Sequence, residues 1–296
     1  MKILGTGLSG LVGSRIVELL SDRYEFEKIS RNTGIDVTDR EKIIEKIKSS
    51  DASIVLHLAA KTDVDGCERD KALGENGDAW KINVEGTKNV VDACQERNKK
   101  LIYVSTDFVF DGKNPSGGGY TEEDAPSPIN WYAKTKYESE KIIQRCSTPW
   151  IIARIAYPYR GNFNKLDFAR AILERLQNNE KVAGVTDHIF TPTFVDDIAY
   201  AIDKLMEKKS TGLFHVVGCQ FLSPFDAAQI IARVFDCDQK LISKTTRSEF
   251  FKDRAPRSFQ LAINSDKIRR LGIKMRGLEE GLMEIKKQQK NLKFKI

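Results

Sequence analysis

The first thirteen residues constrain the fold of this chain more than any other segment. A strand-like run, Lys2–Gly5, leads into three glycines at three-residue spacing, Gly7, Gly10 and Gly13, and then into a helical pattern. Glycine at a strand-to-helix turn lets the backbone approach a pyrophosphate, whose charge is stabilised by the helix N-terminus. The turn therefore predicts a dinucleotide site on the first βα unit, although an ordinary tight turn could use the same glycines.

Strand-like runs alternate with amphipathic helical stretches through the amino-terminal half, as in βαβ units. The expected strands are Lys2–Gly5, Glu27–Ser30, Ile54–Ala60, Leu101–Ser105, Ile151–Ile155 and Leu213–Val217. This order predicts an α/β fold with a Rossmann-type doubly wound parallel sheet. The alternation weakens after Ile155, so we expect a smaller, discontinuous C-terminal lobe that binds substrate. The expected nucleotide-binding domain is 1–155 plus about 195–217, and the expected lobe is about 156–194 plus 218–296.

Two glycine-containing segments, Lys71–Asp78 and Lys113–Gly119, read as loops that a compact sheet does not need. We expect both to be mobile flaps. The second lies between the predicted strand Leu101–Ser105 and a later helix, so it is expected to form a flexible rim of the site.

Composition argues against several other classes of protein. No apolar run approaches the roughly 20 residues that span a bilayer, so we expect a cytoplasmic protein without a membrane partner. Five cysteines without Cys-x-x-Cys spacing indicate free thiols. The net charge of +6 comes from basic residues interleaved with 42 acidic ones, which argues against a nucleic-acid partner. The basic tail Lys286–Lys295 is interpreted as a solvated helix.

The three histidines do not indicate a metal site. His57 and His215 lie inside apolar strand-like runs and are expected to pack in the core, whereas His188 lies in a loop that could face a ligand. No second histidine or carboxylate has metal-ligand spacing to His188, so no metal is predicted.

The end of the second predicted strand bears on cofactor choice. An NAD-specific site usually has an acidic residue there, whereas Arg31 could meet the 2′-phosphate of NADPH. The sequence therefore favours NADPH, with NADH left open and a solvated surface arginine as the alternative. Asp36 and Val37 follow, and Asp36 could accept a hydrogen bond from the adenine amino group.

Tyr132 and Lys136 are four residues apart, and so share one face if the stretch is helical. A cation beside a phenol lowers the phenol pKa and makes it a usable general acid. Ser105, Thr106 and Asp107 follow a predicted strand at its carboxyl end, where open α/β sheets bind ligands. Together these residues predict a proton-transfer site.

At this point the chain resembles the extended short-chain dehydrogenases/reductases, and within them the dTDP-4-dehydrorhamnose reductases. The matching stretches are Gly7–Gly13, Ala59–Asp65, Ile82–Thr87, Ser105–Gly112, Tyr120–Lys136, Thr191–Thr193, Gly212–Gly218 and Ala255–Arg257 leading to Lys267. The resemblance implies reduction of the 4-keto group of a nucleotide-activated 6-deoxysugar by NADPH, as in dTDP-L-rhamnose biosynthesis.

Carried over to this chain, the resemblance implies that Thr106 holds the substrate carbonyl oxygen and Tyr132 protonates it. Lys136 would bind the nicotinamide ribose and tune Tyr132. Asn83 would support Lys136 through water, with a helix-surface asparagine as the alternative. The other expected cofactor contacts are Ser9, Leu11, Val12, Leu58, Ala59, Ala60, Lys61, Ser105 and Ile155. The other expected sugar contacts are Thr62, Val64, Asp107, Phe108, Tyr157 and Arg257.

The chain departs from the reductase pattern at Ala133, usually Gly, at Tyr157, usually Trp, at Ser258, usually Pro, and at Asn264, usually Asp. These departures bear on substrate recognition. Two alternatives therefore stay open: a sugar-nucleotide epimerase of the same superfamily, and a non-catalytic regulatory subunit similar to that of methionine adenosyltransferase. A dehydratase is less favoured, because Phe108 stands where elimination chemistry needs Glu. A homodimer is also left open.

Overall fold

The computed structural model describes residues 1–113 and 117–293, and the chain divides into two compact units. The first unit comprises Met1–Phe110, Ala125–Arg154 and Ile202–Phe214. The second comprises Asp111–Asp124, Ile155–Ala201 and the chain from His215 onward. Each unit is therefore discontinuous in sequence.

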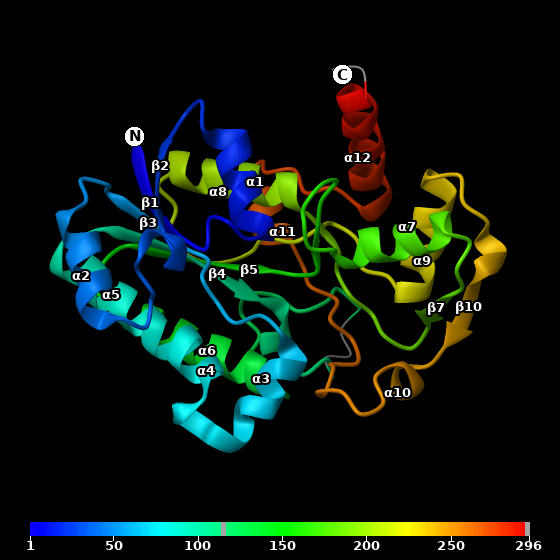
Figure 1. The fold of residues 1–296 in the computed structure, drawn as a ribbon, viewed down its shortest axis with the longest axis horizontal. Helices are drawn as coiled ribbons and strands as arrows, with labels where there is room; N and C mark the ends of the chain where they lie inside the picture. Colours follow the sequence, from blue (N-terminus) through cyan, green and yellow to red (C-terminus); the bar gives the residue numbers. More distant parts are fainter. Residues whose placement is uncertain (114–116, 294–296) are drawn as a thin grey trace. The chain divides into compact units, whose positions relative to one another are not determined.

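A six-stranded sheet in the order β2-β1-β3-β4-β5-β9 organises the first unit (Figure 1). Its strands are β1 Lys2–Thr6, β2 Glu25–Ile29, β3 Ile54–His57, β4 Lys100–Thr106, β5 Trp150–Ile155 and β9 Gly212–His215. The pairs β1–β2, β1–β3 and β3–β4 are parallel, with Leu4 opposite both Glu27 and Val55. Each of the six predicted strand runs overlaps one of these strands, so the predicted α/β fold with a parallel central sheet is confirmed.

Helices lie on both faces of this sheet, with α1 on one side and α2, α5 and α6 on the other (Figure 1). The helices are α1 Leu11–Leu20, α2 Arg40–Ser49, α3 Val64–Asp70, α4 Asp78–Trp80, α5 Gly86–Glu96, α6 Trp131–Gln144 and α8 Val195–Glu207. Asp39 caps α2 by accepting from the Lys42 amide, and Asn130 caps α6 by accepting from the Ala133 amide. Buried residues such as Val55, Ile47 and Val90 form the core beneath α2 and α5.

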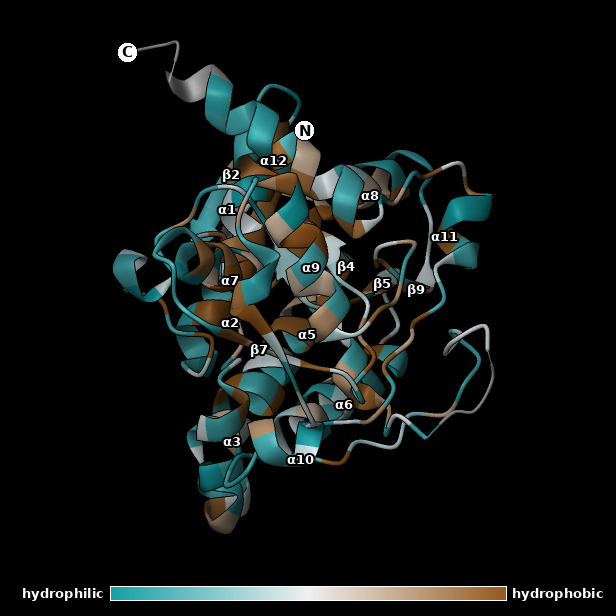
Figure 2. Ribbon diagram, turned by 90° about the vertical axis from the view of Figure 1, so that its right-hand side faces the viewer, coloured by the Kyte–Doolittle hydropathy of each residue, from teal (hydrophilic) through white to brown (hydrophobic). Residues whose placement is uncertain are grey.

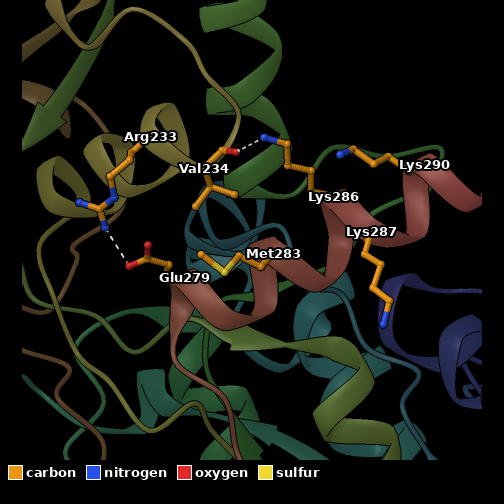
Figure 3. A pocket seen from close by; sticks show the side chains of 7 residues that line it. All are labelled: Arg233, Val234, Glu279, Met283, Lys286, Lys287 and Lys290. Atoms are coloured by element: carbon orange, nitrogen blue, oxygen red, sulfur yellow. Dashed lines mark hydrogen bonds and ion pairs between the residues drawn. The ribbon is translucent and has the colours of Figure 1, made fainter.

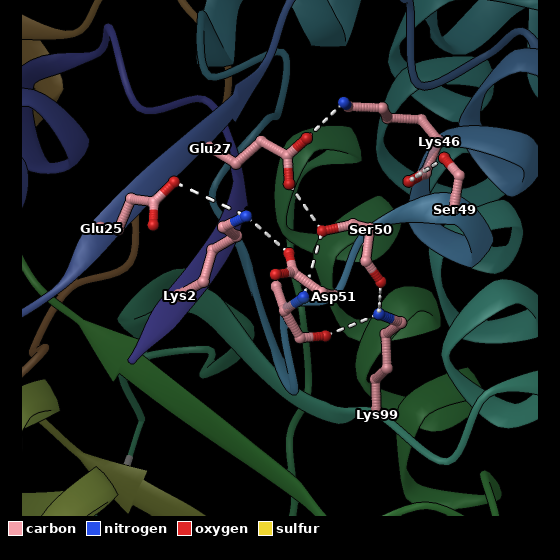
Figure 4. Close-up of polar contacts among 9 residues, drawn as sticks. Lys2, Glu25, Glu27, Lys46, Ser49, Ser50, Asp51 and Lys99 are labelled. Carbon is pink, nitrogen blue, oxygen red and sulfur yellow. Dashed lines mark hydrogen bonds and ion pairs between the residues drawn. The ribbon is translucent and has the colours of Figure 1, made fainter.

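Polar side chains at the amino ends of the strands pair with one another (Figure 4). The Lys2 ammonium lies 2.6 Å from an Asp51 carboxylate oxygen. The buried Lys99 ammonium donates to the Ser50 and Ala52 carbonyls, each at 2.6 Å, just beyond the C-terminus of α2. Glu27 accepts from the Ser50 hydroxyl at 2.6 Å and pairs with Lys46, which lies on α2. This amino edge of the sheet is thus a network of satisfied polar groups.

The segment Lys71–Asp78, predicted as a flap, is helical over most of its length. A 3₁₀-helix, Lys71–Asn76, follows α3, and Gly74 adopts a φ of 54°. An Asp70 carboxylate oxygen accepts from the Ala79 amide at 2.9 Å and from the Lys61 ammonium at 2.7 Å. The loop prediction was therefore wrong, because the Asp70 side chain closes the segment onto the start of α4.

Short strands and helices build the second unit around its own apolar core. Its elements are β6 Pro158–Tyr159, α7 Phe168–Gln177, β7 Val182–Val185, β8 Thr193–Phe194, α9 Pro224–Val234, β10 Ile242–Thr245, α10 Arg247–Phe250, α11 Asp266–Arg270 and α12 Leu278–Lys293. β7 pairs with β10 and β6 with β8, both in parallel. The core includes Tyr159, Leu173, Phe190, Ile231 and Leu282.

Residues 111–124 belong to the second unit, although the predicted boundaries assign them to the first. The Tyr120 amide donates to the Ala262 carbonyl, and the Tyr120 carbonyl accepts from the Asn264 amide, both at 2.7 Å. Gly112 packs so closely that a Cβ there would lie 2.6 Å from the Phe259 nitrogen. The predicted flexible rim Lys113–Gly119 includes residues 114–116, which lie outside the described residues.

Helix α12 packs through Leu278, Leu282 and Ile285, and hydrophilic residues predominate on the rest of its surface (Figure 2). Lys286 donates to the Val234 carbonyl at 2.7 Å, and Glu279 pairs with Arg233 at 2.8 Å (Figure 3). Much of the predicted basic tail is thus the polar face of a helix. None of the helices within residues 1–113 and 117–293 is long and apolar enough to cross a membrane.

Candidate active site

The glycine turn after β1 is built for close backbone approach. Gly7 has a φ of 69°, and a Cβ there would lie 2.6 Å from the Ala59 nitrogen. A Cβ on Gly13 would lie 2.5 Å from the Gly7 carbonyl oxygen, so this glycine permits close packing of α1 on the turn. Gly10 starts α1 with no side-chain cap among the described residues and no acidic residue in the first turn. The helix N-terminus is therefore suited to meet an anion.

A cavity of about 640 Å³ lies at this turn, within the first unit. The predicted cofactor residues that line it are Gly7, Ser9, Arg31, Asp36, Val37, Ala59, Ala60 and Lys61. The lining also includes residues that sequence reasoning missed: Ile29, Ser30, Asn32, Ile35, Thr38, Asp78, Lys81 and Ile82. Most of these residues are adjacent in sequence to predicted ones. For those around the end of the second strand, that position was the sequence feature that could have identified them. Nine predicted contacts do not line this cavity: Gly10, Leu11, Val12, Gly13 and Leu58, which belong to the turn and the end of β3, and Ser105, Tyr132, Lys136 and Ile155.

Arg31 and Asp36 are bonded to each other inside the cavity. Arg31 donates from Nε to Asp36 Oδ2 at 2.5 Å, while Asp36 Oδ1 accepts from the Thr38 amide and hydroxyl. Burial raises the pKa of Asp36, but the hydrogen bonds from Thr38 and Arg31 outweigh it and hold that pKa below its ordinary value. The Arg31 side chain is 72% exposed, and Nη1 and Nη2 have no partner in the described part of the chain. Those two nitrogens remain available to a phosphate.

Tyr132, Lys136 and Thr106 come together at the carboxyl end of β4. Tyr132 and Lys136 lie one turn apart on α6, and both are almost fully buried. Lys136 donates from Nζ to the Val104 carbonyl at 2.8 Å, which fixes the ammonium beside the carboxyl end of the strand. Burial raises the pKa of Tyr132 well above its usual range, and a hydrogen bond with the Thr106 hydroxyl opposes this. The structure therefore places three of the four predicted catalytic residues within one small region.

Burial also changes the charge state of two neighbouring groups. It lowers the pKa of Lys136 to about 7, against the opposing effect of the Glu140 carboxylate. Burial raises the pKa of Asp107 to about 7, although hydrogen bonds with the Thr106 hydroxyl and the Asp107 and Phe108 amides lower it. Both groups thus change protonation state near neutral pH, which is typical of sites that transfer protons.

Three buried polar atoms at this site have no hydrogen-bond partner in residues 1–113 and 117–293: Ser105 Oγ, Asp107 Oδ2 and Trp131 Nε1. A buried polar group left unpaired costs about 1–3 kcal/mol. Such groups in a strand-end site indicate bonds that a polar ligand completes. Trp131 was not predicted as a site residue, and its position next to Tyr132 was the only sequence signal.

Asn83, predicted as part of a proton relay, connects two parts of the site. It lies in a π-helical turn, Lys81–Glu85. Its Oδ1 accepts from the Lys61 amide at 2.8 Å, and its Nδ2 donates to the Lys61 carbonyl and to the Thr135 hydroxyl. The side chain therefore ties the cofactor-side loop to α6, and its relay role stays a prediction.

The expected sugar contacts divide between the two units. Val64 and Phe108 pack against Trp131 and Tyr132 in the first unit, and Thr62 is exposed beside them in sequence. Tyr157 and Arg257 belong to the second unit, and so does Ile155, which was predicted as a cofactor contact.

In the second unit, Tyr157 and His188 line a cavity of about 460 Å³ with several aromatic side chains. Tyr157 has a φ of 39°, a conformation that side chains rarely adopt. His188 Nδ1 donates to the Ser258 carbonyl at 2.9 Å, so His188 Nε2 accepts from the Tyr157 hydroxyl at 3.2 Å. Arg257 packs over the Phe251 ring, which also lines the cavity.

The other two histidines are fully buried, as predicted, and His57 accepts from the Thr6 hydroxyl at 2.6 Å. Burial lowers the pKa of His57 to about 3, so this imidazole is neutral. In the described ranges, no three histidine, cysteine or acidic side chains gather as metal ligands.

Comparison with known proteins adds independent information. A family model described as the RmlD substrate binding domain matches residues 1–291. A dTDP-4-dehydrorhamnose reductase of Aggregatibacter actinomycetemcomitans is 29% identical over 77% of this chain and 76% of its own. Methionine adenosyltransferase 2 subunit beta of Mus musculus is 28% identical over 95% of this chain and 87% of its own. The crystal structure of a Bacillus anthracis dTDP-4-dehydrorhamnose reductase in complex with NADP matches this structure with a TM-score of 0.88 and 28% sequence identity. The match covers 97% of this chain and 99% of the Bacillus chain. This chain belongs to the RmlD substrate binding domain family.

Proposed function

We propose that this protein is an NADPH-dependent reductase of a nucleotide-activated 4-keto-6-deoxysugar, similar to the dTDP-4-dehydrorhamnose reductases of dTDP-L-rhamnose biosynthesis. The observation that carries the proposal is the meeting of Thr106, Tyr132 and Lys136 at the end of β4. The names of the Aggregatibacter relative and the Bacillus structure support it. We place the reaction in the cytoplasm, because all five cysteines are free thiols, which persist in a reducing compartment.

The first unit has the groups that an NADP(H) site needs. The glycine turn and the start of α1, where Gly10 has no side-chain cap among the described residues, suit the pyrophosphate. The terminal nitrogens of Arg31 suit the 2′-phosphate. The Ser105 hydroxyl, which has no partner in the described ranges, offers a polar contact close to the catalytic groups. When bound, the cofactor supplies the hydride. NADH shares the pyrophosphate, so the turn alone does not exclude it.

Side chains of the protein carry out the proton transfer. Thr106 holds the 4-keto oxygen, and the Tyr132 phenol donates its proton to that oxygen as negative charge develops there. Because burial keeps the Tyr132 phenol protonated, the acid is in its working form before reaction. The Lys136 ammonium then stabilises the phenolate that forms, since opposite charges attract strongly at a buried site. Protonated Asp107 and the Trp131 indole supply donors for sugar hydroxyls.

We propose that the second unit, taken by itself, has the groups of a nucleotide site. Its aromatic-lined cavity suits a nucleobase, and the cationic side chain of Arg257 suits a diphosphate. Tyr157, in its strained conformation, is then positioned by its hydrogen bond to His188.

The direct test is NADPH oxidation with a freshly prepared dTDP-4-keto-6-deoxyhexose, with the product identified by mass spectrometry. We expect one NADPH consumed per sugar reduced, and no consumption with the 4-hydroxy sugar nucleotide. A product of unchanged mass and altered stereochemistry, formed without net NADPH loss, would instead identify an epimerase.

A regulatory subunit is the second candidate, because the mouse relative with that name aligns over 95% of this chain. That function predicts tight NADPH binding, no sugar reduction, and a complex with a methionine adenosyltransferase catalytic subunit. Size-exclusion chromatography of the two purified proteins, beside the reductase assay, separates the two candidates and also reports whether the chain is a homodimer.

A further inference from the structure

Tyr103 lies directly against the ammonium of Lys136. The Lys136 Nζ lies 4.0 Å from the centroid of the Tyr103 ring, and Tyr103 and Lys136 are 1% and 3% exposed. At this distance and burial, the negative face of the ring attracts the cation with little screening by water. The ring comes from β4 and the lysine from α6, so the contact joins the strand that carries Thr106 to the helix that carries Tyr132.

The other polar surroundings of Lys136 leave its charge poorly compensated. Its one hydrogen bond in the described ranges goes to a neutral carbonyl, that of Val104. The carboxylate that raises the pKa of Lys136, that of Glu140 on the same helix, is already bonded to Arg154 on β5 at 2.6 and 2.9 Å. His57 on β3 is neutral, and the Tyr132 phenol is protonated.

We propose that Tyr103 is a positioning residue that keeps Lys136 charged and oriented toward Tyr132 through the face of its ring. The proposal rests on the function assigned above to Lys136. It also states which part of Tyr103 matters. The Tyr103 hydroxyl makes no well-aligned hydrogen bond in residues 1–113 and 117–293, although the Ser139 and Thr87 hydroxyls lie near enough to oppose the rise in its pKa that burial causes. The ring face, not the hydroxyl, is the part that contacts the ammonium.

The test weakens the negative electrostatic potential of the ring face while keeping the shape of the ring. Tyr103→Phe keeps the face, and fluorinated phenylalanines incorporated at position 103 weaken it stepwise at nearly constant volume. The pKa of Lys136 is read from the ¹⁵N signal of its side chain, assigned by its loss in Lys136→Met. We expect Tyr103→Phe to match the wild type and the trifluoro variant to titrate lower by about half to one and a half pH units. A pKa of Lys136 that stays constant across the series would overturn the proposal.

Catalysis supplies a second readout. Reduction needs the ammonium form of Lys136, so the basic limb of the kcat/KM profile should move to lower pH in step with fluorination, while NADPH affinity below the pKa stays constant. Thermal stability should fall in step below that pKa, where the ammonium loses part of its attraction to the ring, and stay constant above it. A uniform loss of activity without movement of that limb would show a packing role and contradict the proposal. Because the ¹⁵N titration needs no substrate, a protein that reduces no sugar would refute the proposed function and leave the test of Tyr103 intact.

Discussion

Buried polar side chains differ in their hydrogen bonding between the amino and the carboxyl ends of the parallel strands. At the amino edge, Lys99 is buried but donates to two backbone carbonyls, and Lys2 is paired with Asp51. At the carboxyl edge, Ser105 and Asp107 are equally buried, and each keeps an oxygen with no partner among the residues that the structure describes. Paired groups contribute net stability, whereas unpaired buried groups cost it. The amino edge therefore serves folding, and the carboxyl edge gives up stability to keep groups available for a ligand.

The largest expected effect concerns catalysis at the carboxyl edge. Tyr132→Phe removes the proton donor and keeps the ring packing, so kcat should fall by about 10²–10⁴-fold while NADPH affinity stays within a few-fold. Steady-state kinetics and cofactor titration measure the two quantities. Tyr137→Phe, on the same helix, is the matched control and should change neither. An undiminished kcat in Tyr132→Phe would remove this phenol from the mechanism.

The second prediction concerns stability at the amino edge. Lys99→Met leaves the Ser50 and Ala52 carbonyls without their donor, so the free energy of unfolding should fall by about 2–4 kcal/mol. Chemical denaturation measures this loss, and kcat should be unchanged because Lys99 lies at the opposite end of the strands. A combined loss of activity and stability would break the separation between the two edges.

The third prediction concerns the cofactor cavity. Arg31→Ala removes the proposed partner of the 2′-phosphate, so NADPH binding should weaken by about 1.5–3 kcal/mol and NADH binding should hardly change. Isothermal titration with both cofactors measures the difference. Arg40→Ala is the control, because Arg40 pairs with Asp92 outside the cavity lining. Equal losses for NADPH and NADH would contradict the assignment.

The fourth prediction is that replacing a buried lysine at the carboxyl edge raises the free energy of unfolding, whereas replacing Lys99 at the amino edge lowers it. Burial holds the pKa of Lys136 at about 7, against an ordinary value of 10.5, so between these pH values the unfolded chain binds the extra proton. The wild type should therefore gain stability from this group as pH rises through that window. Lys136→Met should be more stable than the wild type by about 1–3 kcal/mol near and below neutral pH, and the gain should vanish toward pH 10.5.

Denaturation of Lys136→Met and wild type across that pH range tests the sign. Lys141→Met, a half-buried position on the same helix, should show no such pH-dependent gain. Destabilisation by Lys136→Met at every pH would show that this lysine serves folding, as Lys99 does.

The smallest expected effect is at the exposed rim of the amino edge. Asp51→Asn removes one exposed partner of Lys2, so the melting temperature should fall only slightly. The difference should disappear in high salt, because exposed ion pairs are screened there. A loss that persists in high salt would show that the rim is more tightly coupled to the buried network than its exposure suggests.

Local patterns predicted what local interactions determine. Six strand runs and the glycine turn were visible because apolar runs and glycine spacing are properties of adjacent residues. The i to i+4 spacing of Tyr132 and Lys136 places them on one face of any helix, and parallel strands bring their carboxyl ends to one edge. The proton-transfer site was therefore accessible to sequence reasoning.

Long-range pairing was not accessible in the same way. The bonds of Tyr120 to Ala262 and Asn264 join backbone groups, which have no side-chain signature, so the assignment of residues 111–124 to the second unit could not be predicted. Trp131 Nε1 has no hydrogen-bond partner in the described residues because of how distant segments pack around it, and the spacing of residues in the sequence does not predict that packing. The network of Asn83 likewise needs the three-dimensional position of Lys61.

The interleaving of the two units has a consequence for synthesis and inheritance. The chain passes from one unit to the other five times, after Phe110, Asp124, Arg154, Ala201 and Phe214. On the ribosome, the sheet cannot gain β9 until residue 215 has emerged, by which time two segments of the other unit have already been made. Neither unit corresponds to a single stretch of coding sequence. Recombination that exchanges one continuous segment therefore cannot transfer either unit whole, and the two must be inherited together.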